Sequence, residues 1–420
     1  MELSKVTLEI FTKLEQKWLS HCENTKKTRI LSIDGGGTTG IVAGASLVHL
    51  EDQIRLKTGD PQSRIADFFD LIAGTGIGAV LAALLSADDG SGRPLYSARD
   101  AVNLIASRNS ELFKFRHAGV FRRRKRYSGK SMDKALKEMF RRDDGTVLTL
   151  KDTCKPLLVP CFDLKSSAPF VFSRADASES PSFNFDLSNV CRATSATPSL
   201  FKPFNLTSVD GKTSCSAIDG GLVMNNPTSA AVTHALHNKR DFPSVNSVED
   251  LLVLSLGNGQ LTGSGCAQKV RYNGECSTSS VVDIVLDGVS ETIDQMLGNS
   301  FCWNRTDYVR IQVLFNLFYF IFIFEIINFI YFYFLTDGVK CSQANGLGKE
   351  VGVVGARMKE KVLKERGVES LPFGGKRLLT ETNGERIESF AQRLVDSGKA
   401  SLPSSPYKNL ANVSPLANGR

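Results

Sequence analysis

Short apolar runs alternate along the chain with longer segments in which apolar residues recur every three or four positions. The short runs predict buried strands, and they read RILSID, FFDLIAGT, PLLVPCFDL, PFVFSR and DLLVLSLGNG. The longer segments predict helices, of which one ends at Gly59 and another runs from Ile77 to Ala87. Strands that alternate with helices predict an α/β fold, with a mainly parallel central sheet covered by helices on both faces.

The same patterns divide the chain into four parts. Residues 1–28 predict an amphipathic helix, with Phe11, Leu14 and Trp18 on one stripe. Residues 29–260 hold the alternating strands and helices, and residues 261–400 are expected to form a helical C-terminal extension. Residues 401–420 are rich in Ser, Pro and Asn, which predicts a disordered tail.

Composition and charge narrow the classes of function. The chain has 420 residues, of which 42% are hydrophobic, enough for a large core. The net charge of +7 favours anionic surfaces, but no nucleic-acid-binding motif occurs, so no nucleic-acid partner is expected. Nine cysteines without a C-x-x-C pair, and an N-terminus without a secretory signal, indicate reduced thiols in a cytoplasmic protein. Neither a disulfide framework nor a zinc site is expected.

One basic run stands out, from Arg122 to Arg126. A solvated loop is the first interpretation of such a run. Contact with anionic lipid head groups is a sharper alternative, because clustered Lys and Arg side chains each contribute roughly 1 kcal/mol near an anionic membrane. A nuclear address is a third and weaker interpretation.

The segment from Val313 to Leu335 is almost entirely apolar and aromatic. Its length suffices for a transmembrane helix, but Glu325 lies near its centre, where a carboxylate costs roughly 2.5 kcal/mol or more. Phe, Ile, Tyr and Asn can all be encoded with A and T alone. The preferred interpretation of residues 313–343 is therefore a retained intron, so that a transmembrane prediction at 313–335 is an artefact of the gene model.

A glycine-rich turn follows the first predicted strand and precedes a helix. Gly35, Gly37 and Gly40 formally match the dinucleotide-binding pattern G-x-G-x-x-G. The acid expected at the end of a second strand is missing, because Glu51 and Asp52 lie inside the predicted helix. A nucleotide-binding enzyme is therefore an alternative that the rest of the motif does not support.

The same turn has a second use. Glycine-rich backbone at a helix N-terminus presents N–H groups to an anion. Gly36 and Gly37 could therefore form an oxyanion hole, in which each donor typically contributes a factor of about 10²–10³ in rate.

A second tight turn, Gly74-Thr75-Gly76-Ile77-Gly78, connects a predicted strand to an apolar helix. This is the architecture of the nucleophile elbow, G-x-S-x-G. Gly76 stands at the serine position. Glycine accepts the strained backbone of the elbow more easily than serine does, but it has no hydroxyl to form an acyl-enzyme.

A carboxylate marks the third turn. Asp219 ends an apolar strand and is followed by Gly220 and Gly221, after which N-N-P places Pro227 at the start of a helix. Backbone amides in such a turn can orient the carboxylate, although an Asp that merely caps the turn is the simpler interpretation. Upstream, CRATSATPSLFKPF offers small residues for a close-packed wall beside the site.

These motifs, in this order, resemble the patatin-like phospholipase family over about residues 29 to 259. The resemblance implies a three-layer fold and a Ser/Asp dyad without metal or cofactor. It places the base at Asp219, the elbow at Gly74–Gly78 and the oxyanion loop at Gly35–Gly37. Gly76 in place of serine, and Thr38-Thr39 in place of the family's G-G-x-R turn, resemble the class III branch of the plant patatin-related phospholipases.

What is known of that branch implies hydrolysis of acyl esters in phospholipids and galactolipids. The basic run 122–126 adds the expectation that the protein binds the membrane surface peripherally. A catalytically weak or inactive lipid-binding or regulatory protein is the alternative function. Three routes fit the missing serine: attack by water activated by Asp219, substitution by the hydroxyl of Thr75 or Thr38, or binding without hydrolysis. Nothing in the sequence predicts the oligomeric state.

Overall fold

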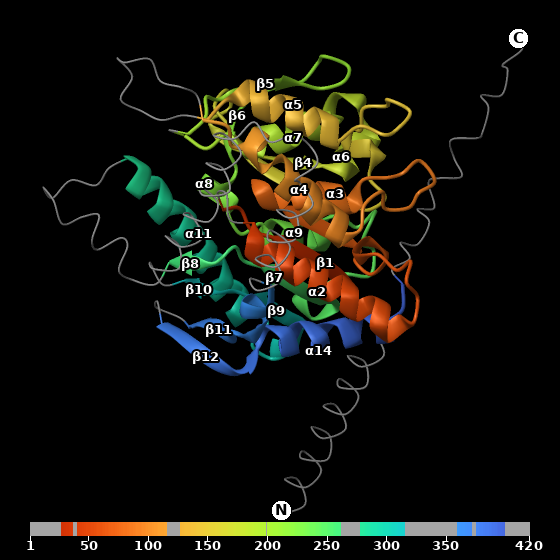
Figure 1. Cartoon of the computed structure of the whole chain (residues 1–420), viewed down its shortest axis with the longest axis vertical. Helices are drawn as coiled ribbons and strands as arrows, with labels where there is room; N and C mark the ends of the chain where they lie inside the picture. Colours follow the sequence, from red (N-terminus) through yellow and green to blue (C-terminus); the bar gives the residue numbers. More distant parts are fainter. Residues whose placement is uncertain are drawn as a thin grey trace, which may run out of the picture.

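A computed structural model describes residues 27–36, 40–115, 127–198, 200–261, 278–315, 359–371 and 375–399. Its centre is an eight-stranded sheet (Figure 1). Seven of the strands follow the order β5-β6-β3-β2-β1-β7-β9, and the eighth, β4, pairs with β3. The strands are β1 (Thr28–Ile33), β2 (Leu71–Gly74), β3 (Leu157–Asp163), β4 (Ala168–Ser173), β5 (Phe204–Thr207), β6 (Ser214–Asp219), β7 (Leu251–Leu256) and β9 (Tyr308–Ile311). The pairs β3-β2, β2-β1, β1-β7 and β7-β9 are parallel, whereas β4, β5 and β6 pair antiparallel.

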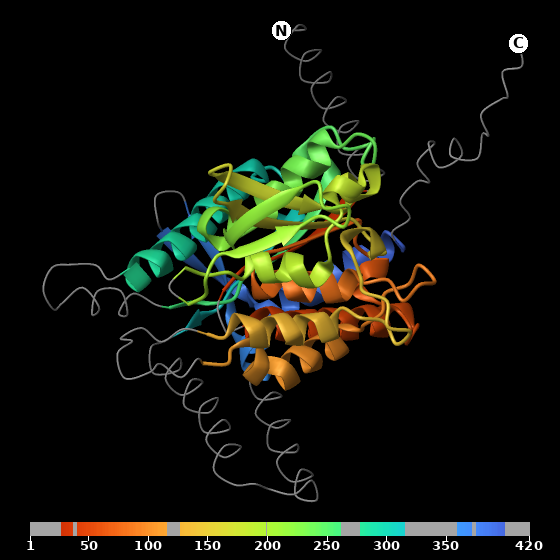
Figure 2. The same ribbon diagram turned by 90° about the horizontal axis from the view of Figure 1, so that it is seen from above.

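Helices cover both faces of this sheet, which makes three layers (Figure 2). One face carries α2 (Ile41–Thr58), α3 (Ile77–Ser86), α4 (Ala98–Leu112), α5 (Gly129–Met139), α7 (Leu187–Thr194) and α14 (Asn383–Asp396). The other face carries α9 (Thr228–His237) and α11 (Thr278–Ser300). Shorter helices are α6 (Arg174–Glu179) and α8 (Gly221–Met224), and 3-10 turns span Ile65–Asp67, Leu150–Asp152, Pro181–Phe183, Val248–Asp250 and Arg305–Asp307.

Alternation along the strands builds two apolar cores. Leu31 and Ile33 of β1 pack into the core beneath α2 and α3, whereas Ile30 packs into the core beneath α9. β1 and β2 are buried throughout, as expected of strands that helices cover on both faces of the sheet. The α/β class, the mainly parallel sheet and its cover on both faces are therefore confirmed.

The chain beyond residue 260 contributes more than helices. β9 extends the central sheet by pairing in parallel with β7, and β11 (Arg366–Leu371) and β12 (Gly375–Thr382) form a separate antiparallel hairpin. The expected boundary at residue 260 thus cuts through the sheet, and the extension is not only helical. β9 has only four residues, reads YVRI with a buried arginine, and so does not stand out as an apolar run in the sequence.

The anomalous apolar segment begins inside the described part of the chain. Val313 is buried, and β10 (Leu314–Phe315) pairs in parallel with β8 (Gln260–Leu261). The remainder of 313–343 lies outside the described residues, as do 1–26, 122–126 and 401–420. Within the described residues, no helix combines the length and the apolar character needed to cross a membrane.

Candidate active site

Strand β3 brings the elbow and Asp219 together. β2 pairs with the first half of β3 through Ala73 and Leu158, and β6 pairs with the second half through Asp219 and Cys161. Leu158 and Cys161 are three residues apart, which is about 10 Å along a strand. β2 and β6 lie on opposite edges of β3, one parallel and one antiparallel to it, so the turns that follow them approach each other along β3. Thr194 contacts both turns, since its Oγ1 accepts from the Gly76 N–H and its carbonyl oxygen accepts from the Gly220 N–H.

The elbow keeps its strained backbone although its serine is absent. Gly76 has φ of 54° and ψ of −125°, a conformation that side-chain-bearing residues adopt only under strain. Thr194 Oγ1 accepts a hydrogen bond of 3.1 Å from the Gly76 N–H. Among the described residues, a Cβ at position 76 would meet only the Cα of Gly35, at 3.7 Å, an ordinary contact distance. The described part of the turn thus leaves room for a side chain at the position where a nucleophile elbow carries its serine.

The flanking glycines serve close packing. A Cβ at Gly74 would lie 2.4 Å from the carbonyl oxygen of Gly78, and a Cβ at Gly78 would lie 2.4 Å from that of Asp34. The start of α3 therefore contacts both its own strand and the end of β1. Gly40, at the start of α2, packs against Ile77, with 3.3 Å from its Cβ position to Cγ1.

Asp219 is buried and holds two hydrogen bonds. Its Oδ1 accepts from the Gly221 N–H at 2.8 Å, and its Oδ2 accepts from the Thr197 hydroxyl at 2.6 Å. Burial raises the pKa of Asp219 above its ordinary value, while these two hydrogen bonds act in the opposite direction. A carboxylate with a raised pKa is a better proton acceptor, and this one also caps its own turn.

Gly220 shapes the turn that presents Asp219. A Cβ at Gly220 would lie 2.1 Å from the carbonyl oxygen of Pro160, so only glycine fits against β3 at this position. Gly221 is less constrained, since its Cβ position lies 2.6 Å from Cδ2 of Leu286 and 3.1 Å from Oδ1 of Asp219, which are side-chain atoms. Close approach to the backbone thus requires glycine at position 220 of the D-G-G motif.

The glycine-rich loop after β1 is held from several directions. The Gly35 N–H donates to the carbonyl oxygen of Asn225 at 2.8 Å, and Asn258 Nδ2 donates to the carbonyl oxygen of Gly35 at 3.1 Å. Gly36 has φ of 147°, which favours glycine. Among the described residues, no hydrogen bond occupies the Gly36 N–H. Gly37 and Thr38 lie outside the described residues.

Residues far along the chain anchor this loop. Arg310 of β9 forms an ion pair with Asp34, the residue before the loop, and both side chains are buried. Asn225, which accepts from Gly35, is itself held because its Nδ2 donates to Ser290 Oγ at 2.8 Å and to the carbonyl oxygen of Leu286 at 3.2 Å. The extension beyond residue 260 is therefore part of the site.

Thr75 is poorly placed as a substitute nucleophile. Its side chain is completely buried, and its hydroxyl donates to the carbonyl oxygen of Met224 at 2.7 Å. The hydroxyl proton is thus donated to a backbone carbonyl and not to Asp219.

Sequence reasoning missed four residues that contact these turns: Thr194, Thr197, Asn225 and Arg310. The motif CRATSATPSLFKPF predicts a wall of small residues, whereas the structure shows that its two threonines bond to Gly76 and Asp219. Asn225 lay within the N-N-P motif but was not singled out. Nothing near Arg310 in the sequence could have linked it to a loop 276 residues away.

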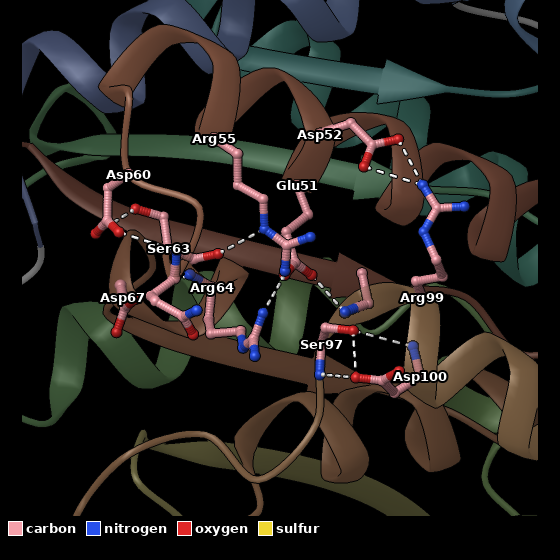
Figure 3. Close-up of polar contacts among 12 residues, drawn as sticks. Glu51, Asp52, Arg55, Asp60, Ser63, Arg64, Asp67, Ser97, Arg99 and Asp100 are labelled. Carbon is pink, nitrogen blue, oxygen red and sulfur yellow. Dashed lines mark hydrogen bonds and ion pairs between the residues drawn. The ribbon is translucent and has the colours of Figure 1, made fainter.

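The two acidic residues near the dinucleotide-like pattern, Glu51 and Asp52, form ion pairs with arginines. Glu51 is buried and forms ion pairs with Arg55 and Arg64, and Asp52 pairs with Arg99 at 3.0 Å (Figure 3). These contacts tie α2 to the start of α4 and to the turn before β2. Neither carboxylate is available to hold a ribose, which removes the support for a nucleotide site.

Comparison with known proteins agrees with the geometry. A family model described as patatin-like phospholipase matches residues 31–232. Probable inactive patatin-like protein 9 from Arabidopsis thaliana is 69% identical over 421 aligned positions, which cover 100% of both chains. The chain belongs to the patatin-like phospholipase family.

Other family members are similar at lower identity. Patatin-like protein 6 from Arabidopsis thaliana is 41% identical, over 88% of this chain and 71% of that protein. Patatin-like protein 3 from Oryza sativa subsp. indica is 36% identical, over 93% of this chain and 90% of that protein. The resemblance drawn from the glycine motifs is thus confirmed, and the function at the level of the family is lipid acyl hydrolysis.

Proposed function

We propose that this chain hydrolyses acyl esters of membrane phospholipids and galactolipids slowly, with Asp219 as the general base. The observation that carries the proposal is the retained elbow. Gly76 holds the strained turn with space for a reacting group, and a buried carboxylate of raised pKa lies on the neighbouring turn.

The oxyanion of the tetrahedral intermediate would be bound by backbone amides. Gly36, with Gly37 as the sequence predicts, would supply one side of this oxyanion hole. Ile77, the first residue of α3, would supply the N–H that follows the nucleophile position. Such donors and substrate binding alone leave about 10³–10⁴ of rate enhancement when a triad nucleophile is removed. Weak hydrolysis without the elbow serine is therefore physically reasonable, and it requires no metal or cofactor.

A second candidate function is lipid binding without turnover. Gly76 has no hydroxyl, and one similar plant protein carries the name probable inactive. The two functions share the same site and differ only in whether an ester bond is broken.

Release of fatty acid from phospholipid vesicles by the purified full-length chain separates these functions. Asp219→Asn should reduce the rate by about 10²–10⁴, the usual contribution of a general base. Asp186→Asn is the matched control, because burial also raises the pKa of Asp186, which lies outside the site at the start of α7. Hydrolysis that Asp219→Asn leaves unchanged would contradict the assignment of the base, and binding without any hydrolysis would favour the second candidate.

We also propose that the chain acts in the cytoplasm and binds membranes peripherally, aided by the basic run 122–126. This binding should weaken as salt rises, because surface charges are screened beyond about 8 Å at physiological ionic strength. Binding that is independent of salt would point to apolar insertion instead. The acyl hydrolase domain is proposed to span residues 29–260 and to be completed by β9 from the extension.

A further inference from the structure

The hydroxyl of Thr197 donates to Oδ2 of Asp219 at 2.6 Å. A nucleophile and its base lie within about 2.6–3.2 Å of each other in enzymes that form acyl intermediates. We propose that Thr197 supplies the nucleophile that Gly76 lacks, so that the site works as a Thr/Asp dyad. This inference rests on the proposed function and names the group that attacks the ester.

Hydrogen bonds hold the segment that carries Thr197 against the turn of the base and against the elbow. The segment that follows α7 runs along the turn of the base, since the Asp219 N–H donates to the carbonyl oxygen of Ala196 at 3.2 Å and the Gly220 N–H donates to that of Thr194 at 3.3 Å. The side chain of Thr194 in turn accepts from the Gly76 N–H at 3.1 Å. One short segment therefore contacts both the nucleophile position and the base.

Asp219 is oriented to receive a proton from Thr197. Its Oδ1 is occupied by the Gly221 N–H, which leaves Oδ2 to the Thr197 hydroxyl. Burial keeps the pKa of Asp219 above its ordinary value, which favours proton uptake. Thr197 itself is only half-buried, so an ester can approach it from solvent.

Other hydroxyls nearby are less suited to attack. Thr75 is fully buried and donates to the carbonyl oxygen of Met224. Thr194 is also fully buried, and its oxygen accepts from the elbow amide. Ser195 is buried, and its hydroxyl has no hydrogen-bond partner among the described residues. Among the side-chain hydroxyls described in the structure, Thr197 alone bonds to Asp219.

The reaction balances with water as the only co-substrate. The Thr197 oxygen bonds to the ester carbonyl carbon while its proton passes to Asp219. The carbon–oxygen bond to the lipid alcohol then breaks, and that alcohol takes the proton from Asp219. Water attacks the acyl-threonine, Asp219 accepts the proton of the water and returns it to Thr197, and the fatty acid leaves.

A structural role for Thr197, in which its hydroxyl only holds Asp219 in place, would give the same hydrogen bond but no covalent product. An alkyl fluorophosphonate distinguishes the two roles, because an activated hydroxyl bonds to its phosphorus and displaces fluoride. The full-length chain is treated with this probe, and the labelled peptide is identified by mass spectrometry. Gly76→Ser serves as a positive control for entry of the probe into the site.

We expect labelling at Thr197 in the unmodified chain, at least tenfold less in Asp219→Asn, and none at this position in Thr197→Val. Thr197→Ser should be labelled at least as fast as the unmodified chain, and Ser195→Ala should match the unmodified chain. Circular dichroism and thermal unfolding establish that each variant is folded.

The dyad is overturned if Gly76→Ser is labelled at position 76 while the unmodified chain stays unlabelled at Thr197. It is also overturned if Thr197→Val releases fatty acid at the unmodified rate, in which case water activated by Asp219 is the nucleophile and the proposed function stands. Absence of both labelling and hydrolysis in the unmodified chain and in Gly76→Ser contradicts the dyad and the proposed function together.

Discussion

The guanidinium of Arg310 donates to both carboxylate oxygens of Asp34, with distances of 2.8 Å from Nη1 to Oδ1 and 2.5 Å from Nη2 to Oδ2. Burial opposes the charge of Arg310, but the Asp34 carboxylate more than offsets this and holds the pKa of Arg310 above its ordinary value. Asp34 immediately precedes the glycine loop, so this pair fixes the backbone from which the oxyanion donors project.

Arg310→Met should destabilise the fold by about 3–5 kcal/mol, because it leaves the Asp34 carboxylate buried without a partner. Burial raises the pKa of Asp34, so the loss of unfolding free energy caused by Arg310→Met should be smaller at acidic pH, where the carboxyl takes up a proton. Urea unfolding at several pH values measures both effects.

Arg305→Met is the matched control for Arg310→Met. Arg305 lies on the same segment, but its side chain is 64% exposed and pairs with Glu369 at 3.6 Å. Exposed pairs contribute about 0–1 kcal/mol. Equal losses of stability in the two variants would show that the buried pair has no special role.

Asp219→Asn should stabilise the fold at neutral pH while it removes activity. The folded-state pKa of Asp219 is raised by burial, so the stability linked to its protonation is full below the unfolded pKa of about 3.9 and is lost as pH rises through the folded value. The variant should therefore melt above the unmodified chain at pH 7, and the gap should narrow toward pH 4. A variant less stable at pH 7 would mean that the hydrogen bonds from Thr197 and Gly221 outweigh the cost of burial.

Gly220→Ala should destabilise the fold by about 1–3 kcal/mol through overpacking, since the added Cβ meets the carbonyl oxygen of Pro160. Gly288→Ala provides the comparison. Gly288 lies within α11 with nothing within 4 Å of its Cβ position, and Ala is favoured over Gly in a helix by about 1 kcal/mol. Opposite signs of the change in unfolding free energy are expected. A neutral Gly220→Ala would show that the turn after β6 can shift away from β3.

The sequence predicts those parts of the fold whose signals are local. Apolar runs located β1, β2, β3, β4 and β7, and Gly59 ends α2 in the left-handed conformation with φ of 67°, as its position in the pattern indicated. Each of the three turns could likewise be predicted from its glycines. Their meeting point could be predicted only through the resemblance to a family.

What escaped sequence reasoning depends on contacts between distant segments. The ion pair of Asp34 with Arg310 spans 276 residues, and the hydrogen bond of Thr75 to Met224 spans 149. The hydrogen bond between Thr197 and Asp219 forms because β6 pairs antiparallel with β3. The periodicity of apolar residues does not predict which strands pair or in which direction. The pairing of β9 with β7 could not be predicted either, because it also joins segments that lie far apart in the sequence.

Gly76→Ser tests the central claim, that the elbow retains a working geometry without its serine. The strained φ should cost about 1–3 kcal/mol of stability, and the Cβ position meets only the Cα of Gly35 within the part of the chain that the structure describes. Gly92→Ser is the matched control, because Gly92 also has positive φ, at 87°, with open space around it, and lies outside the site.

The decisive measurement is the initial rate of fatty-acid release from phospholipid vesicles by folded Gly76→Ser. We predict a rate at least about tenfold above that of the unmodified chain, since loss of a catalytic serine elsewhere costs far more than this. The gain should disappear when Asp219→Asn is added, and Gly92→Ser should show no gain. A folded Gly76→Ser that binds vesicles and yet hydrolyses no faster than the unmodified chain would contradict the account.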